Sequence, residues 1–428
     1  MKQLKIGLLG LGQVGSGVYS ILNSKGTELA RKCGTRLLIS KIAVRNTSKR
    51  RLVAPKRSLI TTSALSIVRD PELDVVVELI GGIHPAKELI LAALRSGKDV
   101  VTANKALLAE HGRDLFREAQ RCGRTLLFEA SVGGGIPIIK ATREGLAANR
   151  IRSIHSIING TSNYVLTKMA SSHVDFKEAL SMAQKKGYAE ANPKLDLEGI
   201  DSAHKLTLLS SLVFGGWVRF QDVFVTGISS IRSEDVSFAE EFGYTIKLLA
   251  IAKKTRSGIE AHVRPTLLPK SHVLSNVNGS YNAILMHGDE VGDILFYGRG
   301  AGSLPTGSAV VSDLIDLARM KREGLKLPAP LHLNRLHVRN VSVLESRFYL
   351  RFHVVDQPGV LARISRILGG RHVSISDVIQ KERKIGGVVP LILLTHKAPE
   401  RSVLRAVQAI DRLSIAKGKT QVFWIEES

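Results

Sequence analysis

Short apolar runs alternate with amphipathic stretches over the first 130 residues of the sequence. The apolar runs predict strands at 3–9, 37–44, 74–80, 99–102 and 125–130, and the amphipathic stretches predict helices at 13–30, 84–96 and 105–122. Almost purely apolar strands that alternate with helices are typical of a parallel sheet covered on both faces. We therefore expect an α/β domain with a doubly wound parallel sheet.

The pattern changes near residue 136, where helices become longer and strands less regular. Helices are expected at 162–171, 176–186 and 201–214, and strands at 151–158 and 263–268. This mixture predicts a central α+β domain. The segment 298–318 is a glycine-rich loop that enters a helix, and a charged, proline-containing stretch follows it.

The last 80 or so residues predict strands and helices in the order β-α-β-β-α-β, which indicates a small ferredoxin-like domain. We therefore divide the chain into domains at 1–135 and 136–322, with 298–318 returning to the first domain, then a linker at 323–345 and a third domain at 346–428.

Composition and charge narrow the classes of protein to which the chain could belong. The sequence has 428 residues, a formal net charge of +23 and two cysteines, Cys33 and Cys122, which suits a reducing, cytoplasmic environment. No run approaches the length of about 20 apolar residues that a membrane span needs. Basic residues are spread along the whole chain and aromatic residues are few, so we expect no nucleic-acid and no membrane partner, and a preference for anionic small ligands.

A glycine motif after the first strand carries the first candidate chemistry. Gly10, Gly12 and Gly15 form GxGxxG between a predicted strand and a predicted helix, with Gln13 and Val14 inside the motif. In that context the glycines let the backbone approach a pyrophosphate, which rests on the helix N-terminus. We expect a Rossmann dinucleotide site, and a glycine-rich turn without a ligand is the alternative.

Arg45 follows the second strand, where sites that prefer NAD usually carry an acidic residue. Arg45 together with Lys49, Arg50 or Arg51 would suit a 2′-phosphate, so NADP is favoured over NAD. The alternative is a solvated basic loop.

The segment 185–206 places four acidic side chains within the sixteen residues that end at Lys205. Asp201 and Lys205 are spaced i, i+4 at the start of a predicted helix and would share one face. Carboxylates beside a lysine suit a small amino-acid substrate, because carboxylates hold an ammonium group and lysine can move a proton. The alternative is an exposed ion pair that contributes only a few tenths of a kcal/mol.

Seven blocks in order resemble homoserine dehydrogenase over nearly the whole chain. They lie at 7–18, 76–82, 100–109, 128–137, 158–166, 186–206 and 297–314. The resemblance implies NAD(P)H-dependent interconversion of L-aspartate 4-semialdehyde and L-homoserine, on the route to threonine, methionine and isoleucine.

The resemblance also implies roles for individual residues. Lys205 would donate the proton, and Asp201 would orient Lys205 or the substrate. Glu190 would bind the substrate ammonium, with Asp196 lining the same pocket, and Lys105 would contact cofactor or substrate and is also a catalytic candidate.

Two further sets of ligands follow from the resemblance. Thr102, Asn104 and Gly302 would line the cofactor cleft together with Lys105. A monovalent cation, expected to be sodium, would be held by the Glu129 carboxylate and by backbone carbonyl groups, because oxygen donors suit a hard cation. The carbonyl donors would come from Val132, Gly134 and Ile136. A hinge without an ion is the alternative.

The C-terminal unit resembles an ACT domain, with Asp356, Gly359, Val360 and Leu361 in its strand-to-helix turn. The resemblance implies a regulatory amino acid, for which threonine is our hypothesis, and pairing of chains into a homodimer or homotetramer through the central and ACT domains. A purely structural module is the alternative.

Asn192 departs from the family pattern, because aspartate usually stands there, and Ser156 replaces a more usual glycine. Two other interpretations stay open. One is a dehydrogenase acting on another amino-acid semialdehyde. It is disfavoured because phosphorylating semialdehyde dehydrogenases need a nucleophilic cysteine, and neither Cys33 nor Cys122 lies where a catalytic residue is expected. The other is an amino-acid-sensing regulatory protein with an inactive Rossmann domain.

Overall fold

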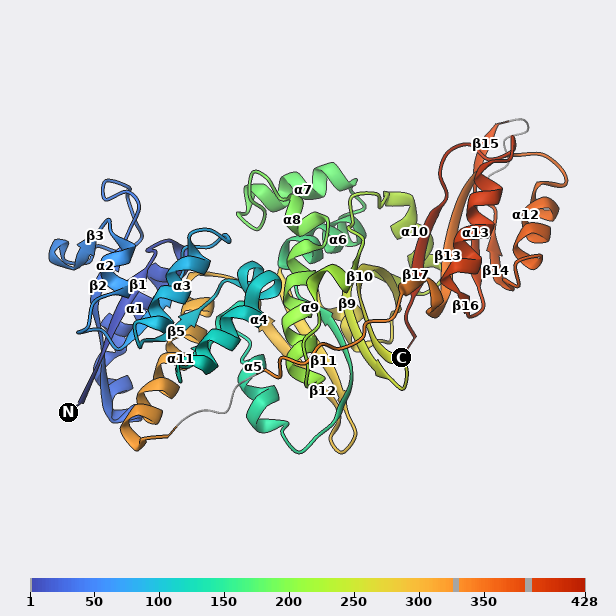
Figure 1. Ribbon diagram of the computed structural model, residues 1–428. Helices are drawn as coiled ribbons and strands as arrows, with labels where there is room; N and C mark the ends of the chain where they lie inside the picture. Colours follow the sequence, from blue (N-terminus) through green and yellow to red (C-terminus); the bar gives the residue numbers. More distant parts are fainter. Residues whose placement is uncertain (1, 326–330, 382–386, 428) are drawn as a thin grey trace. The chain divides into compact units, whose positions relative to one another are not determined.

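The computed structural model describes residues 2–325, 331–381 and 387–427 (Figure 1). The chain divides into two compact units. Unit 1 consists of Met1–Ile154, Asp201–Asp222 and Tyr281–Leu336, and unit 2 consists of His155–Ile200, Val223–Ser280 and His337–Ser428. Within the described ranges, none of the helices has both the length and the apolar character that a membrane crossing demands.

Unit 1 is built on a parallel sheet with the strand order β3-β2-β1-β4-β5-β6. The strands are β1 (Lys2–Leu9), β2 (Thr35–Ala43), β3 (Ile60–Thr61), β4 (Val75–Glu78), β5 (Asp99–Thr102) and β6 (Leu126–Leu127). The helices between them are α1 (Gln13–Cys33), α2 (Ala64–Val68), α3 (Ala86–Arg95) and α4 (Lys105–Arg121). The strand order reverses between β1 and β4, which is where such sheets bind ligands. The expected doubly wound parallel sheet is confirmed.

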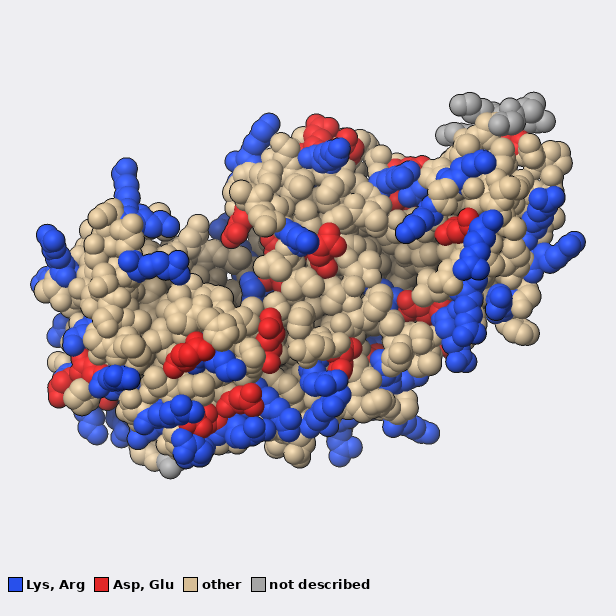
Figure 2. Space-filling view, turned by 45° about the horizontal axis from the view of Figure 1, so that its top comes forward, with Lys and Arg blue, Asp and Glu red and all other residues tan. Residues whose placement is uncertain are grey.

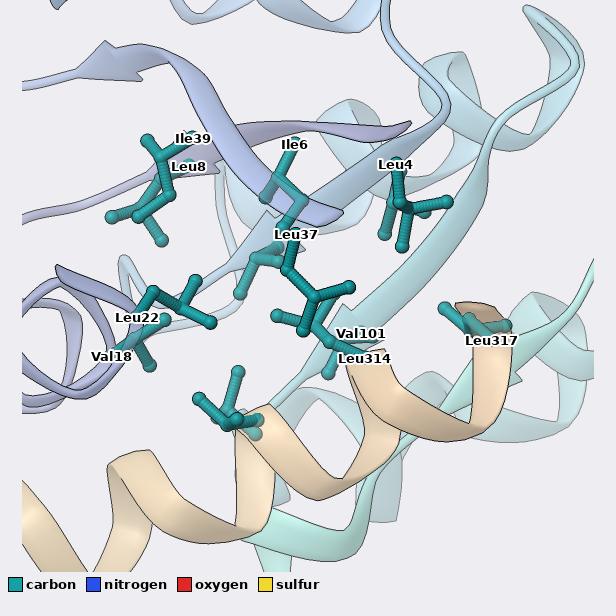
Figure 3. Close-up of a cluster of buried hydrophobic side chains, with 14 of the residues drawn as sticks. Leu4, Ile6, Leu8, Val18, Leu22, Leu37, Ile39, Val101, Leu314 and Leu317 are labelled. Carbon is teal, nitrogen blue, oxygen red and sulfur yellow. The ribbon is translucent and has the colours of Figure 1, made fainter. Parts of the chain in front are cut away.

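A later segment of the chain completes the core of this sheet. The helix α11 (Ser303–Glu323) contributes Leu314 and Leu317 to the same buried cluster as Leu4 and Ile6 of β1 (Figure 3). Fully burying a leucine or isoleucine side chain contributes about 1.5–3 kcal/mol. The glycine-rich segment near residue 300 is therefore anchored against the N-terminal sheet.

Glycines allow α1 and α11 to approach closely. A Cβ atom at Gly17 of α1 would lie 2.1 Å from the carbonyl oxygen of Ser303, and one at Gly307 of α11 would lie 2.9 Å from the backbone of Gly17. Any side chain at these two positions would push the N-terminal halves of the helices apart.

Unit 1 contains further short helices, one long helix and a hairpin. They are η2 (Glu129–Ser131), α5 (Ile138–Lys140), η3 (Ala141–Gly145), α9 (Ile200–Val213), η4 (Phe220–Asp222), β11 (Tyr281–Gly288) and β12 (Gly292–Arg299). The strand expected at 125–130 is shorter than predicted, because the N–H of Glu129 donates to Asp313 Oδ2 of α11 instead of to a neighbouring strand.

Unit 2 begins in β7 (Ile151–Ile157), within which the division between the units falls. Its first part contains α6 (Gly160–Ser172), α7 (Phe176–Lys185), α8 (Lys194–Leu197), β8 (Phe224–Val225), α10 (Ser233–Glu241), β9 (Tyr244–Thr255), β10 (Gly258–Pro269) and η5 (Val273–Asn276). The strand expected at 263–268 lies within β10, which forms a long antiparallel pair with β9, a strand that was not predicted.

The C-terminal part of unit 2 has the order expected from the sequence. It contains η6 (Val341–Val343), β13 (Glu345–Val355), α12 (Val360–Gly369), β14 (Ile375–Ile379), β15 (Val388–Thr395), β16 (Ala398–Pro399), α13 (Glu400–Asp411) and β17 (Gln421–Ile425). The sheet order β17-β13-β15-β14 is antiparallel, and α12 and α13 share a core with β13 and β15. The ferredoxin-like fold is therefore confirmed. In addition, β17 pairs with β10 in parallel, which joins this sheet to the central one.

Candidate active site

Lys105, Asp201 and Lys205 form a charge cluster in unit 1. Lys105 is the first residue of α4, and Asp201 and Lys205 stand one turn apart on α9. Asp201 Oδ1 lies 2.6 Å from Lys105 Nζ, and Asp201 Oδ2 lies 2.7 Å from Lys205 Nζ. One carboxylate therefore holds two ammonium groups, one on each oxygen.

Burial and charge act on Asp201 in opposite directions. Burial raises the pKa of this carboxyl, but the ammonium groups of Lys205 and Lys105 outweigh burial and hold the pKa of Asp201 well below its usual range. The side chain of Lys205 is 9% exposed and that of Lys105 is 40% exposed. An ionised carboxylate thus fixes one buried and one accessible ammonium group, an arrangement that can deliver a proton to a small substrate.

The contact between Asp201 and Lys205 was predicted from their spacing and is confirmed. The alternative of an exposed ion pair is wrong, because Asp201 and Lys205 are both buried. The contact between Lys105 and Asp201 has no signal in the sequence, because the two residues come from helices far apart along the chain.

The carboxyl ends of β4 and β5 position the start of α4. Asn104 caps the helix, and its Nδ2 donates to the carbonyl of Gly82 at 2.7 Å. Thr102 Oγ1 donates to Glu78 Oε2 at 2.6 Å and accepts from the N–H of Asn104 at 3.0 Å. Glu78 is thus a positioning residue that sequence reasoning missed, since a lone glutamate at a strand end has no characteristic spacing.

The glycine loop has the backbone geometry that a pyrophosphate site requires. Gly10 has a φ of +99°, in the left-handed region, and a Cβ atom at Gly15 would lie 2.3 Å from the carbonyl oxygen of Gly10. Gly12 is the N-cap of α1, and Gln13 and Val14 begin its first turn. The free N–H groups of that turn form an anion site.

The N-terminus of α11 lies beside the same loop. Ser303 Oγ donates to the carbonyl of Gln13 at 2.6 Å, and Gly302 is the N-cap of α11 with a φ of +128°. The structure therefore brings Gly302 next to the dinucleotide motif, although almost three hundred residues separate them in the sequence.

Arg45 is exposed in the loop that follows β2. In that loop, Arg51 Nη1 donates to the carbonyl of Lys49 at 2.7 Å, so this guanidinium stabilises the loop itself. Arg45 is the first basic residue of the loop that follows β2.

Glu129 and Asp313 form a second buried cluster of carboxyl groups. The Glu129 carboxylate accepts hydrogen bonds from the N–H groups of Ile139, at 3.0 Å, and Lys140, at 2.8 Å, and its own N–H donates to Asp313 Oδ2 at 2.9 Å. Burial raises the pKa of Glu129 to about 7 and raises the pKa of Asp313 well above its usual range. The described residues contain no cluster of three or more His, Cys, Asp or Glu side chains suited to a metal ion.

The loop after Glu129 contains Val132, Gly134 and Ile136, the expected carbonyl donors. A Cβ atom at Gly134 would lie 2.3 Å from the carbonyl oxygen of Gly300, and the Ile136 carbonyl accepts from the N–H of Ile138 at 2.8 Å. A carboxylate offers about four acceptor positions, of which backbone N–H groups occupy two at Glu129. A buried carboxylate beside loop carbonyls fits a hard monovalent cation by donor type.

In unit 2, the two expected substrate-binding acids differ in environment. Asp196 Oδ1 accepts from Asn159 Nδ2 at 2.7 Å, and Asp196 Oδ2 accepts from Thr161 Oγ1 at 3.2 Å, so this carboxylate holds the first turn of α6. Glu190 is exposed in the loop after α7. The geometry gives Asp196 an organising role and leaves Glu190 accessible.

The turn from β13 into α12 contains the expected effector residues. Gly359 caps α12 with a φ of +86°, and the N–H of Asp356 donates to the carbonyl of Gly387 at 2.9 Å. Val360 packs in the core and Leu361 is exposed.

His204 lies beside the charge cluster on α9 and was not expected from the sequence. Its ring packs on Phe220 at 4.5 Å between centroids, and its Nε2 lies 3.7 Å from Glu110 Oε1. Burial lowers the pKa of His204 to about 4, so the ring is neutral at pH 7. The cluster therefore has no third positive charge from this side chain at neutral pH.

The chain matches three family models. Residues 10–129 match the NAD-binding domain of homoserine dehydrogenase, residues 137–315 match homoserine dehydrogenase, and residues 348–413 match the ACT domain. A homoserine dehydrogenase of Pseudomonas aeruginosa is 43% identical over 434 residues, with 100% of both chains covered. One of Bacillus subtilis is 39% identical over 430 residues, covering 100% of this chain and 99% of the relative. The crystal structure of a homoserine dehydrogenase from Thiobacillus denitrificans superposes with a TM-score of 0.95 at 45% identity, covering 100% of this chain and 99% of the other.

Proposed function

The chain belongs to the homoserine dehydrogenase family, and we propose that Lys205 delivers the proton when the protein reduces L-aspartate 4-semialdehyde to L-homoserine. Bound NAD(P)H supplies the hydride. Lys205 donates a proton to the aldehyde oxygen as the alcohol forms, and takes it back in the reverse reaction. The observation that carries this proposal is the contact of Asp201 with both Lys105 and Lys205.

Replacement of Lys205 tests the proposal. We expect Lys205→Ala to lower kcat for homoserine oxidation at least about 10²-fold, the usual contribution of a positioned proton donor. Lys25→Ala, which removes an exposed lysine of α1, is the matched control and should keep normal activity. Turnover of Lys205→Ala within a few fold of the unmodified protein would remove Lys205 from the role.

Glu190 is proposed to bind the substrate ammonium group. Its exposure supports this, because an exposed carboxylate is accessible to a substrate. Asp196 is proposed to line the same pocket. Its carboxylate accepts from Thr161 Oγ1, which also contacts the carbonyl of Tyr188 in the loop that carries Glu190. Glu190→Gln should raise KM for homoserine with a smaller change in kcat, and a change in kcat alone would contradict this assignment.

The cofactor is proposed to be NADP, with Arg45 at the 2′-phosphate. Two facts support this: Arg45 lies two residues after the end of β2, and no acidic side chain stands there. Arg45→Ala should raise KM for NADP far more than KM for NAD, whereas Arg57→Ala, another exposed arginine of the same region, should change neither. Equal effects of Arg45→Ala on both cofactors would refute the assignment.

Glu129 is proposed to bind a monovalent cation, with sodium as the candidate, together with carbonyls of Val132, Gly134 and Ile136. A cation there would offset the charge of a buried carboxylate. The melting temperature should rise in sodium chloride relative to tetramethylammonium chloride at equal ionic strength, and Glu129→Gln should abolish the difference. An unchanged difference in the variant would place the ion elsewhere.

The ACT domain is proposed to bind threonine at the turn that contains Asp356, Gly359, Val360 and Leu361. The position of this turn at the N-terminus of α12 supports the proposal, because a helix N-terminus favours a bound carboxylate. Isothermal titration with L-threonine should give measurable heat, and no heat and no inhibition at millimolar concentration would overturn it.

The protein is proposed to assemble as a homodimer or homotetramer. The hairpin of β11 and β12 supports this, because it exposes Leu295 and a stacked pair of tyrosines, Tyr281 and Tyr297, whose rings lie 5.1 Å apart. Light scattering should show more than one chain, and Leu295→Glu with Tyr297→Glu should lower the mass. The alternative of an inactive regulatory protein has no support, since it predicts the loss of Lys205 or Asp201.

A further inference from the structure

The outer surface of the two helices in the ACT domain is strongly basic. Six arginines are exposed on or directly after α12 and α13. They are Arg363, Arg366, Arg371, Arg401, Arg405 and Arg412. We call this surface the arginine face. In Figure 2, lysine and arginine side chains crowd the region that carries these two helices.

The spacing of the arginines places them on one side of each helix. Arg401, Arg405 and Arg412 follow one another at i, i+4 and i+11 along α13, and Arg363 and Arg366 are spaced i, i+3 on α12. The opposite sides of both helices are buried in the core, and the two helices contact each other. The arginines therefore lie on the sides of two neighbouring helices that face away from the core.

No carboxylate in the described part of the chain forms an ion pair with any of the six arginines. The two acids of α13 are engaged elsewhere: Glu400 accepts from Arg264 Nη1 at 3.1 Å, and Asp411 accepts from the N–H of Thr420 at 3.2 Å. The charge of the arginine face is therefore uncompensated, unlike that of Arg351, which is paired with Asp235 at 2.6 Å.

We propose that the arginine face binds the phosphodiester backbone of double-stranded DNA without sequence preference. Arginine matches phosphate oxygens with a rigid fork of donors, and all six residues are arginine rather than lysine. All aromatic side chains of the ACT domain are buried, so none is available to stack on unpaired bases, which favours a duplex over a single strand.

Two other occupants fit the surface less well. A second copy of the same face would bring six uncompensated positive charges against six more. A membrane surface would need apolar side chains to insert, and only Leu361 and Leu404, each 38% exposed, accompany the arginines. The spread of basic residues along the sequence led us to expect no nucleic-acid partner, but that reasoning could not detect a surface that forms when two helices pack together.

The test is fluorescence anisotropy of the full-length protein with a 30-base-pair DNA of arbitrary sequence. We expect a Kd of about 10⁻⁴–10⁻⁶ M near physiological salt, and a logarithmic salt dependence with a slope of roughly −0.9 for each phosphate contacted. Arg366→Glu with Arg401→Glu and Arg405→Glu should weaken binding more than tenfold and flatten the slope by about 2–3.

The matched control reverses three exposed basic residues of unit 1: Lys25→Glu, Arg31→Glu and Arg36→Glu. Both triple variants change the net charge equally, and homoserine oxidation should stay normal in both, which shows that they are folded. Equal weakening by both would mean that binding is due to diffuse charge, and would overturn the proposal. It would also be overturned by no binding at 100 μM protein, by tenfold tighter binding of a 30-base-pair RNA, or by preferential binding to vesicles with phosphatidylserine.

Discussion

Two groups of carboxylates in unit 1 are almost equally buried, yet their pKa values shift in opposite directions. Asp201 lies between the ammonium groups of Lys105 and Lys205, and its pKa is held low. Glu129 and Asp313 lie beside each other, and both pKa values are raised. Burial raises the pKa of all three carboxyl groups, and only at Asp201 do two contacting ammonium groups outweigh it.

The difference in ionisation separates the proposed functions of the two groups. An ionised Asp201 can hold two lysines in place for proton transfer and for contacts with the substrate. Ionising Glu129 and Asp313 is costly where they are buried, and a bound cation would offset that cost, in line with the proposed cation site. Three substitutions test the contrast between the two groups.

The largest effect is expected for Asp201→Asn. The variant leaves two lysines without their shared carboxylate, and breaking such a buried pair costs about 3 kcal/mol or more at pH 7. The pKa of Asp201 is lower in the folded protein than in the unfolded chain. The stability that Asp201 contributes to the folded protein is therefore present above the unfolded pKa and is lost as the pH falls below about 4. Urea denaturation at pH 7 and at pH 3.5 should therefore show a difference from the unmodified protein that shrinks at the lower pH.

Asp114→Asn is the control for this experiment. Asp114 forms an exposed ion pair with Arg117 at 3.2 Å, and such a pair contributes less than about 1 kcal/mol. A loss of stability in Asp201→Asn no larger than that in the control would contradict the idea that Asp201 is a strongly paired charge.

An intermediate effect is expected for His204→Phe, which keeps the ring packed on Phe220. The folded pKa of His204, about 4, lies below the unfolded value of 6.5, so protonation favours the unfolded chain as the pH falls through this window. The unmodified protein should lose on the order of 2 kcal/mol more stability than the variant between pH 7 and pH 4. Urea titrations at both pH values measure the difference, and parallel losses would show that His204 is protonated in the folded state.

The smallest effect is expected for Asp313→Asn. The raised pKa means that burial and the neighbouring Glu129 disfavour the charged form, so a neutral amide that still accepts from the Glu129 N–H costs little. The free energy of unfolding at pH 7 should stay within about 1 kcal/mol of the unmodified protein. A loss as large as that of Asp201→Asn would mean that Asp313 is a paired anion, and the contrast between the two clusters would fail.

Much of the fold could be predicted because its signals are local. Most apolar strands and amphipathic helices of the parallel sheet and of the ferredoxin-like domain were predicted to within about three residues of their ends, whereas the short β3 and α2 were not predicted. The strand at 125–130 was predicted too long, because a contact from Glu129 to Asp313, far along the chain, turns the backbone away from the sheet.

The site could be predicted only in part. The pair Asp201 and Lys205 is local, since one helical turn separates the two residues, and it was found. The bond of Lys105 to Asp201, the role of Glu78 and the contact of Ser303 with Gln13 each join segments with no fixed separation in sequence.

Local patterns along the chain therefore predict most of the elements, their order, the glycine motif and the acids and lysines available for chemistry. Long-range packing sets which charges meet, and with them the ionisation of Asp201, Glu129, Asp313 and His204. The physical reason is that helix and strand periodicity depends on neighbours along the chain, whereas the pKa of a buried group depends on desolvation and on charges a few ångströms away.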